Sequence, residues 1–224
     1  MTELADLTLA DMTLAELRAE LAEDVADAAV FDGWSMAAAE TVAAARGLDP
    51  ALVRAAFADG AMAMIAAWIE SVDRRMEASL APDELAKLSI RERIRRLVQF
   101  RLDAIAGLEE ALRRAMAIMA MPGNVAAAAR LGWHSADLMW RLAGDVASDY
   151  NHYTKRMTLL GIYTATLAVF ADDTSEGKAE TRAFLDRRIE GVMRFEKAKA
   201  RFFRPDVEHF SLARLAGRLR YPAA

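Results

Sequence analysis

The fold is decided by residues 35–57, which read SMAAAETVAAARGLDPALVRAAF. Ser35 can cap a first helix, because its hydroxyl accepts a hydrogen bond from an amide that the first turn leaves free. Gly47 begins a short turn. Asp49 can cap the next helix, and Pro50 then takes its first position, where an amide hydrogen is not needed. The stretch therefore predicts two short helices joined by a tight turn.

Two further helices flank this stretch. Thr13 and Glu16 have the spacing of a capping box, which opens a helix that reaches about Phe31. Another helix is expected over residues 61–76. Helix, helix, turn and helix is the order of a helix-turn-helix domain. We therefore expect an N-terminal three-helix part of this type.

The remaining residues also favour helix. Ala, Leu, Met, Glu and Arg dominate them, and no stretch alternates apolar and polar residues with the period of a strand. Helices are expected to open at Ser89, to end after the Met-rich run 115–121, and to cover residues 134–150, 154–171 and 177–203. The predicted fold class is all-α, with an acidic helix-turn-helix-like part (1–60), a helical ligand-binding body (61–203) and an amphipathic C-terminal segment (204–224).

Charge is distributed unevenly along the chain. Residues 1–60 contain twelve acidic and three basic side chains, a net of −9, and since the whole chain carries −4, the other residues carry +5. Affinity for nucleic acid arises mainly from Lys and Arg that neutralise phosphates. A helix-turn-helix part of this charge would be repelled by a duplex, and Arg54 alone cannot reverse that. We therefore expect no nucleic-acid partner.

The residues that common catalytic and metal sites require are missing or scattered. The chain has no Cys, three His, and no Glu-x-x-His sequence of the kind that di-iron helical bundles use. Asp145 and Asp149 stand at i, i+4, but such a pair is frequent on ordinary helices and indicates catalysis only weakly. We therefore expect no enzymatic activity and no metal or other cofactor.

Neither a targeting signal nor a membrane-spanning segment is expected. The N-terminus is acidic and has no basic leader. The longest apolar run, residues 157–171, has 15 residues and includes three threonines. A spanning helix needs about 20 predominantly apolar residues. The sequence therefore predicts a cytoplasmic chain.

The most specific pattern lies in residues 137–156, DLMWRLAGDVASDYNHYTKR. A similarity in residue type and spacing to a known family extends from about Arg101 to Met193 and is strongest in this stretch. In these residues the chain resembles the TetR-like lipid-binding accessory proteins of ubiquinone biosynthesis. In that family the partner is the di-iron demethoxyubiquinone hydroxylase. The resemblance implies a TetR-like fold whose body binds a lipid and whose surface docks the hydroxylase.

The docking patch that the resemblance implies lies on residues 139–156. The candidates are Met139, Trp140, Asp149, His152, Tyr153 and Arg156. His152 departs from the pattern, because eukaryotic members of the family carry Trp at this position. Two alternatives remain open: Trp140 could simply pack in the core, and Tyr153 and Arg156 could cap the following helix.

A lipid pocket in the body is also supported by the residues themselves. Methionine side chains are flexible and polarisable, so they suit adaptable apolar walls, although methionines are also common in ordinary cores. The helix over residues 154–171 is apolar nearly all round, which places it centrally. The pocket candidates are Met116, Met119, Met121, Met157, Leu160 and Tyr163. The expected ligand is an isoprenoid quinone intermediate or a phospholipid.

The C-terminal segment has the pattern of an amphipathic helix. Apolar and basic residues alternate there at helical spacing, and such a helix can lie in the surface of an anionic bilayer. The candidates for membrane contact are Phe210, Leu212, Leu215, Arg214 and Arg218. The alternative is a helix docked on the bundle or on a second subunit. We expect a protein peripheral to the inner (cytoplasmic) membrane and, by analogy with the fold, a homodimer.

Together these patterns predict a non-enzymatic protein that binds a lipid or quinone precursor and presents it to a hydroxylase of ubiquinone biosynthesis. The main alternative is a ligand-responsive transcriptional regulator of the TetR type. A third interpretation is a lipid-binding scaffold with another partner, and this interpretation is consistent with His152.

Overall fold

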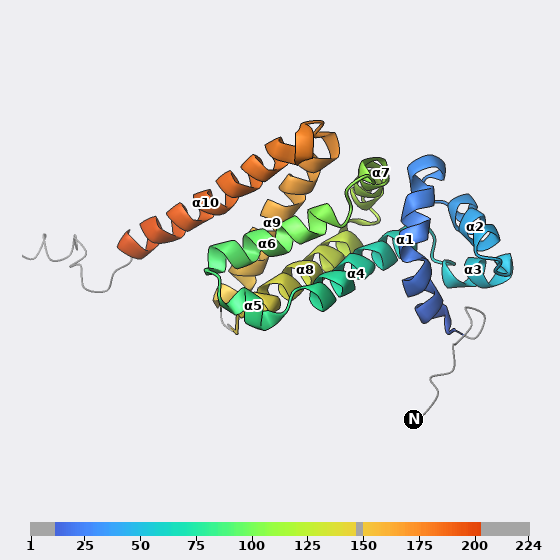
Figure 1. The fold of residues 1–224 in the computed structure, drawn as a ribbon, viewed down its shortest axis with the longest axis horizontal. Helices are drawn as coiled ribbons and strands as arrows, with labels where there is room; N and C mark the ends of the chain where they lie inside the picture. Colours follow the sequence, from blue (N-terminus) through green and yellow to red (C-terminus); the bar gives the residue numbers. More distant parts are fainter. Residues whose placement is uncertain (1–11, 147–149, 203–224) are drawn as a thin grey trace, which may run out of the picture. The chain divides into compact units, whose positions relative to one another are not determined.

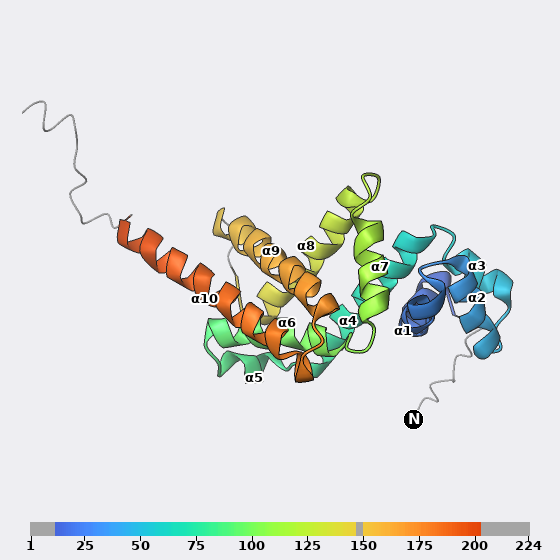
Figure 2. The same ribbon diagram turned by 90° about the horizontal axis from the view of Figure 1, so that it is seen from above.

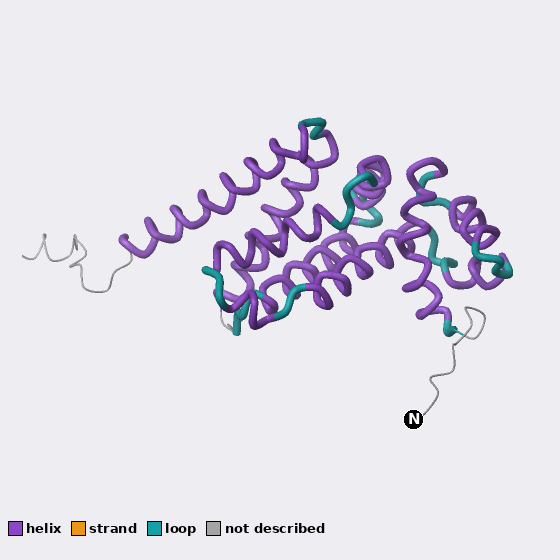
Figure 3. Tube along the Cα trace, viewed as in Figure 1, coloured by secondary structure: helices purple, strands orange, loops and turns teal. Residues whose placement is uncertain are grey.

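The structure is a computed structural model that describes residues 12–146 and 150–202. Within these ranges every regular element is a helix, as Figure 3 shows, so the all-α fold class is confirmed. The chain divides into two compact units, Met1–Asp186 and Arg187–Ala224. The division expected at residues 60 and 203 stays a prediction. The predicted membrane-contact residues lie outside the described ranges: Phe210, Leu212, Leu215, Arg214 and Arg218.

The N-terminal helices begin where their capping residues predict. The three helices are α1 (Leu14–Asp32), α2 (Met36–Ala45) and α3 (Pro50–Ala56). Thr13 and Glu16 form the full capping box, with hydrogen bonds in both directions. The Ser35 hydroxyl accepts from the amide of Ala38, and the Asp49 carboxylate accepts from that of Ala51. The local sequence thus determines all three helix starts.

The three-helix part is joined to the body through aromatic side chains. Phe57, which ends α3, is fully buried. The rings of Trp34 and Trp68 have centroids 5.3 Å apart, and Trp68 belongs to α4 (Ala61–Ser79). The indole Nε1 of Trp34 donates to the carbonyl of Ala111 at 2.9 Å. These contacts fix α1 and α2 against the helices that form the body.

The body is built from long helices and one short one. They are α5 (Pro82–Ala86), α6 (Ile90–Asp103), α7 (Glu109–Met119), α8 (Val125–Leu142), α9 (Tyr150–Asp172) and α10 (Ala179–Phe202), with a 3₁₀ turn at Glu176–Lys178. Figures 1 and 2 both show α4 and α8 side by side, and α9 lies against α7 and α8. The short α5, which follows the break at Pro82, was not expected from the sequence.

The stretch with the most specific sequence pattern is not one helix. A helix was expected over residues 134–150, but α8 ends at Leu142 and α9 begins at Tyr150. Gly144 has a φ of +87°, a left-handed conformation that glycine adopts freely. The amide of Asp145 donates to the carbonyl of Trp140 at 2.9 Å, and this bond closes the end of α8. The prediction missed this glycine stop.

The position of α9 also differs from the expectation. Leu159, Tyr163 and Phe170 are buried, as a central helix requires, but Tyr153 is 60% exposed and Met157 is 58% exposed. In the part of the chain that the structure describes, one side of this apolar helix is therefore exposed to solvent. An apolar sequence on all faces did not mean burial on all faces.

Among the described helices, none is individually long and apolar enough to cross a bilayer. Pro50–Ala56 and Ala61–Ser79 reach that length and composition only as a pair, and they are bent by 84° where they meet.

Candidate functional site

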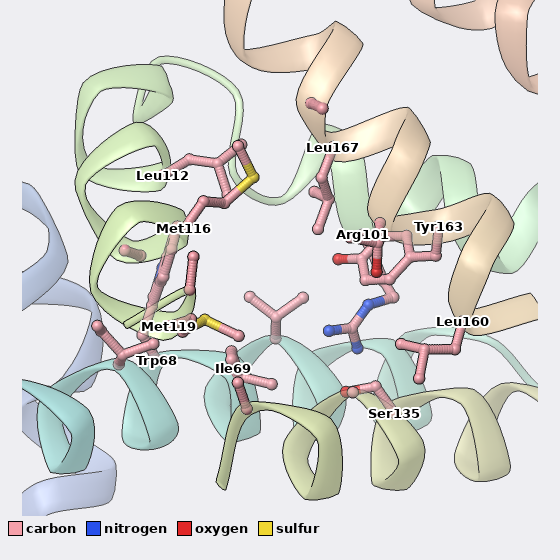
Figure 4. Close-up of a pocket in the computed structure, with 18 of the residues that line it drawn as sticks. Trp68, Ile69, Arg101, Leu112, Met116, Met119, Ser135, Leu160, Tyr163 and Leu167 are labelled. Atoms are coloured by element: carbon pink, nitrogen blue, oxygen red, sulfur yellow. The ribbon is translucent and has the colours of Figure 1, made fainter. Parts of the chain in front are cut away.

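A cavity of about 530 Å³ lies within the body, between α4, α6, α7, α8 and α9 (Figure 4). Small-molecule sites in proteins typically have volumes of about 300–1,000 Å³. Its walls are almost entirely apolar. The apolar lining residues labelled in Figure 4 are Trp68, Ile69, Leu112, Met116, Met119, Leu160 and Leu167. The cavity can therefore hold a mainly hydrocarbon ligand.

Four of the six predicted pocket residues line this cavity: Met116, Met119, Leu160 and Tyr163. Met121 and Met157 do not. Met121 lies beyond the last residue of α7 and is 53% exposed, and Met157 lies on the uncovered side of α9. The helix end and the helix face decide which of the predicted methionines reach the cavity.

The cavity has a buried inner wall and an exposed rim. Residues of α4 and α6 on the inner wall, such as Ile65 and Val72, are buried. Some lining residues at the start of α8 and along α9 are exposed, among them Val125, Ala129 and Thr164. The cavity therefore opens to solvent between α8 and α9.

A buried polar cluster, made of Asp73, Arg101, Ser135 and Tyr163, interrupts the apolar wall. Arg101 is 2% exposed, and its Nη1 donates to a carboxylate oxygen of Asp73. The other oxygen of Asp73 accepts from the Ser135 hydroxyl at 2.8 Å. The guanidinium carbon of Arg101 lies 5.0 Å from the centre of the Tyr163 ring. This cluster joins α4, α6, α8 and α9 at the cavity.

Arg101 stays charged inside the protein. Burial lowers its pKa, but the neighbouring Tyr163 and Asp73 outweigh burial and raise the pKa above its ordinary value. The sequence analysis did not select Arg101, Ser135 or Asp73 as site residues. A signal was present: Arg101 follows Ile94, Leu97 and Val98 at helical spacing, so it falls on the apolar face of α6.

Two of the predicted docking residues cannot contact a partner directly. Met139 is fully buried, and Arg156 is 2% exposed. The Nε of Arg156 donates to Asp137 at 2.7 Å, and its Nη1 donates to Asp145 at 2.8 Å. Asp137 lies on α8 and Arg156 on α9, so the arginine connects the two helices. Arg156 therefore stabilises the packing of α9 against α8.

These ion pairs form a helix clasp, made of Asp137, Trp140, Asp145, Lys155 and Arg156. The Nζ of Lys155 donates to Asp145 at 2.6 Å and lies 5.4 Å from the centre of the Trp140 ring. The indole Nε1 of Trp140 donates to the carbonyl of Lys155 at 3.0 Å. The clasp holds the end of α8 against the start of α9.

The charges of the clasp stabilise each other. Burial raises the pKa of Asp145, but hydrogen bonds from Lys155 and Arg156 outweigh burial and lower that pKa below its ordinary value. Burial likewise lowers the pKa of Arg156, and Asp137 and Asp145 more than compensate, so the pKa of Arg156 is raised. The residues of the helix clasp belong to the most specific sequence pattern, and their contacts hold the end of α8 against the start of α9.

The other docking candidates lie at the surface or outside the described ranges. Tyr153 is exposed, and His152 and Trp140 are half-buried. The rings of Trp133, His152 and Tyr153 form an aromatic patch, with centroids 5.1–6.3 Å apart. Trp133 was not among the predicted residues. Asp149 lies outside the described residues.

The part of the chain that the structure describes contains no group of three or more His, Cys, Asp or Glu residues that could hold a metal ion. Asp73 is bound to Arg101 and Asp145 to Lys155 and Arg156, and the carboxylate of the buried Asp173 accepts hydrogen bonds from Ser175 and Thr181.

The arrangement of helices defines a TetR-like protein whose body contains an apolar cavity. A solved structure with this fold is the TetR transcriptional regulator from Nitrosomonas europaea ATCC 19718, with a TM-score of 0.64 and 21% sequence identity. The match covers 80% of this chain and 99% of the regulator. At that identity the likeness concerns the fold alone.

The resemblance to the ubiquinone-biosynthesis family is confirmed by sequence comparison. The model of the COQ9 family matches residues 125–196, which include the helix clasp and one side of the cavity. The chain is 31% identical over 168 residues to the mitochondrial ubiquinone biosynthesis protein COQ9 of Rattus norvegicus, covering 72% of this chain and 54% of that protein. It is 29% identical to the COQ9 of Homo sapiens, also over 168 residues, with 72% and 52% covered. The chain spans about half the length of these curated relatives.

Proposed function

We propose that this chain is a non-enzymatic accessory protein of ubiquinone biosynthesis that binds a lipid or quinone precursor and presents it to a di-iron hydroxylase. The observation that carries the proposal is the apolar cavity of about 530 Å³, one side of which is formed by the residues that match the COQ9 family model. An accessory role agrees with the names of the similar proteins, which are ubiquinone biosynthesis proteins. The exposed rim gives a lipid a route in and out.

The aromatic patch is the proposed docking surface for the hydroxylase. Aromatic side chains dominate the energetics of protein interfaces, and the exposed Tyr153 is the most accessible ring of the patch. The neighbouring Met157 extends this surface along α9. The helix clasp acts indirectly, because it fixes the start of α9 from which these side chains project. Membrane contact through residues 204–224 and homodimerisation complete the proposal.

A transcriptional regulator is the second candidate, and the fold is the observation that favours it. The ion pairs of the arginines in the N-terminal helices argue against a transcriptional regulator. Arg54, the basic residue of α3, pairs with Glu40 at 2.8 Å, and Arg46 pairs with Asp24 at 2.6 Å. Neither arginine is left to neutralise a phosphate without breaking its ion pair. A gel shift with genomic fragments that survives moderate salt would support the regulator instead.

Presentation can be tested by turnover of the hydroxylase on a demethoxy quinone embedded in vesicles. The chain should raise the rate. Ala129→Trp places a large ring at the exposed rim and should abolish the increase. Ala126→Trp, also exposed on α8 but outside the cavity lining, is the matched control and should keep it. Equal rates with and without the chain would contradict the proposal.

A further inference from the structure

The buried polar cluster leaves one hydrogen-bond donor unused. The Nε of Arg101 is buried and has no hydrogen-bond partner among the described residues. Such unsatisfied groups are rare in native proteins, since each loses its hydration without compensation. Arg101 also lines the cavity. Figure 4 shows its guanidinium between Tyr163 and Ser135, across the cavity from Met116 and Met119.

We propose that Arg101 marks a head-group site, and that the cavity binds an amphiphile head first, with a neutral oxygen acceptor of the head against the guanidinium. A carbonyl or phenolic oxygen has this chemistry. The inference rests on the proposed lipid-binding function and specifies its ligand: an apolar tail that ends in a compact, oxygen-bearing, uncharged head.

A neutral head fits better than an anionic one because the charge of Arg101 is already balanced. Asp73 pairs with it, and Ser135 donates to the same carboxylate. Among the residues that the structure describes, Arg101 is the only charged side chain that lines the cavity. A carboxylate or phosphate brought to this wall would therefore meet a neutral ion pair, and its desolvation would not be repaid. A neutral oxygen needs only a donor, and a charged donor forms the stronger type of hydrogen bond.

The orientation follows from the two sides of the cavity. Arg101 belongs to the buried inner wall, as do Val72 and Ser135. The rim, where Val125 and Thr164 are exposed, is apolar or weakly polar. A head at Arg101 therefore directs the tail toward the opening between α8 and α9, where a tail longer than the cavity can extend into solvent.

The test uses three probes with the same ten-carbon tail: 2-decyl-1,4-benzoquinone, decylbenzene and decanoic acid. Their affinities for the full chain can be measured from quenching of tryptophan fluorescence, since Trp68 lines the cavity. The double variant Asp73→Asn/Arg101→Leu removes both charges together, so that neither is left unpaired. Arg54→Leu, which removes the arginine of an exposed ion pair outside the cavity lining, is the control.

The quantity that decides is the ratio of the quinone affinity to the decylbenzene affinity. We expect this ratio to fall about tenfold in the double variant and to stay unchanged in Arg54→Leu, because a buried hydrogen bond to a charged group is worth roughly that much. Taking the ratio cancels the different partitioning of the probes from water. Decanoic acid should bind the wild-type chain more weakly than the quinone.

An equal ratio in the wild-type chain and the double variant would overturn the head-group site while leaving lipid binding intact. Tighter binding of decanoic acid than of the quinone would also overturn it. If none of the probes binds, the proposed lipid-binding function fails and the inference fails with it. Should the double variant not fold, Arg101→Lys, which keeps a cation opposite Asp73, must still lower the ratio.

Discussion

Replacing Arg156 by methionine should destabilise the protein strongly, because the helix clasp depends on this buried cation. Arg156 is 2% exposed and binds Asp137 and Asp145, which are 24% and 5% exposed. Removing one partner of a buried ion pair typically costs about 3–5 kcal/mol. Lys155 would still bind Asp145, so the lower end, about 3 kcal/mol, is expected. For a chain of this size that is a fall in Tm of about 6–12 °C.

The matched control is Arg141→Met. Arg141 also pairs with Asp137, at 3.1 Å, but its side chain is 56% exposed. An exposed ion pair contributes about 0.5 kcal/mol. Urea unfolding followed by far-ultraviolet circular dichroism should therefore separate the two variants clearly. If Arg156→Met and Arg141→Met lower the free energy of unfolding equally, the clasp does not hold α8 against α9.

Four further variants test the same junction and the cavity wall. Gly144→Ala should cost about 1–2 kcal/mol in urea unfolding, because φ is +87° there. The pKa of Asp145 is below its ordinary value of 3.8, so the stability it contributes is complete above that pH and is lost as the pH falls below it. The difference in free energy of unfolding between the wild-type chain and Asp145→Asn should therefore narrow in acid. A Cβ on Gly132 would lie 2.6 Å from Leu160 Cδ1, so Gly132→Ala should cost about 1 kcal/mol, whereas Gly161→Ala, which meets nothing within 4 Å, should stabilise α9 by about 0.5–1 kcal/mol.

Each of these has an outcome that would count against it. If Gly144→Ala left the free energy of unfolding unchanged, α8 would not end in a left-handed residue. A constant difference for Asp145→Asn across the acidic range would mean that its carboxylate is not held by cations in the folded state. Similar effects of Gly132→Ala and Gly161→Ala would remove the argument for close contact between α8 and α9.

Helix starts could be predicted from the sequence because their causes are local. Thr13, Ser35 and Asp49 each cap the helix that follows within a few residues, and the structure has all three caps. The stop at Gly144 is equally local, but it was missed because the surrounding pattern was taken as a single helix. Glycine followed by aspartate after an apolar turn was a sufficient signal.

The site depended on tertiary contacts that spacing alone does not determine. Met116 and Met119, predicted from composition, line the cavity, but the sequence could not show that Met157 lies on the exposed side of α9. The partnership of Asp73 with Arg101 joins residues 28 positions apart in the chain, on different helices. Residues with the most specific pattern, such as Arg156, were interpreted as surface residues although they hold two helices together.

The central claim, that the cavity holds a lipid, is tested most directly by native mass spectrometry with lipid extraction. The chain would be purified without detergent and then incubated with vesicles that contain a quinone precursor. The account predicts an added mass that matches an extracted lipid in the wild-type chain and in Ala126→Trp, and its loss in Ala129→Trp. A mass of the polypeptide alone in all three proteins, before and after incubation, would contradict it.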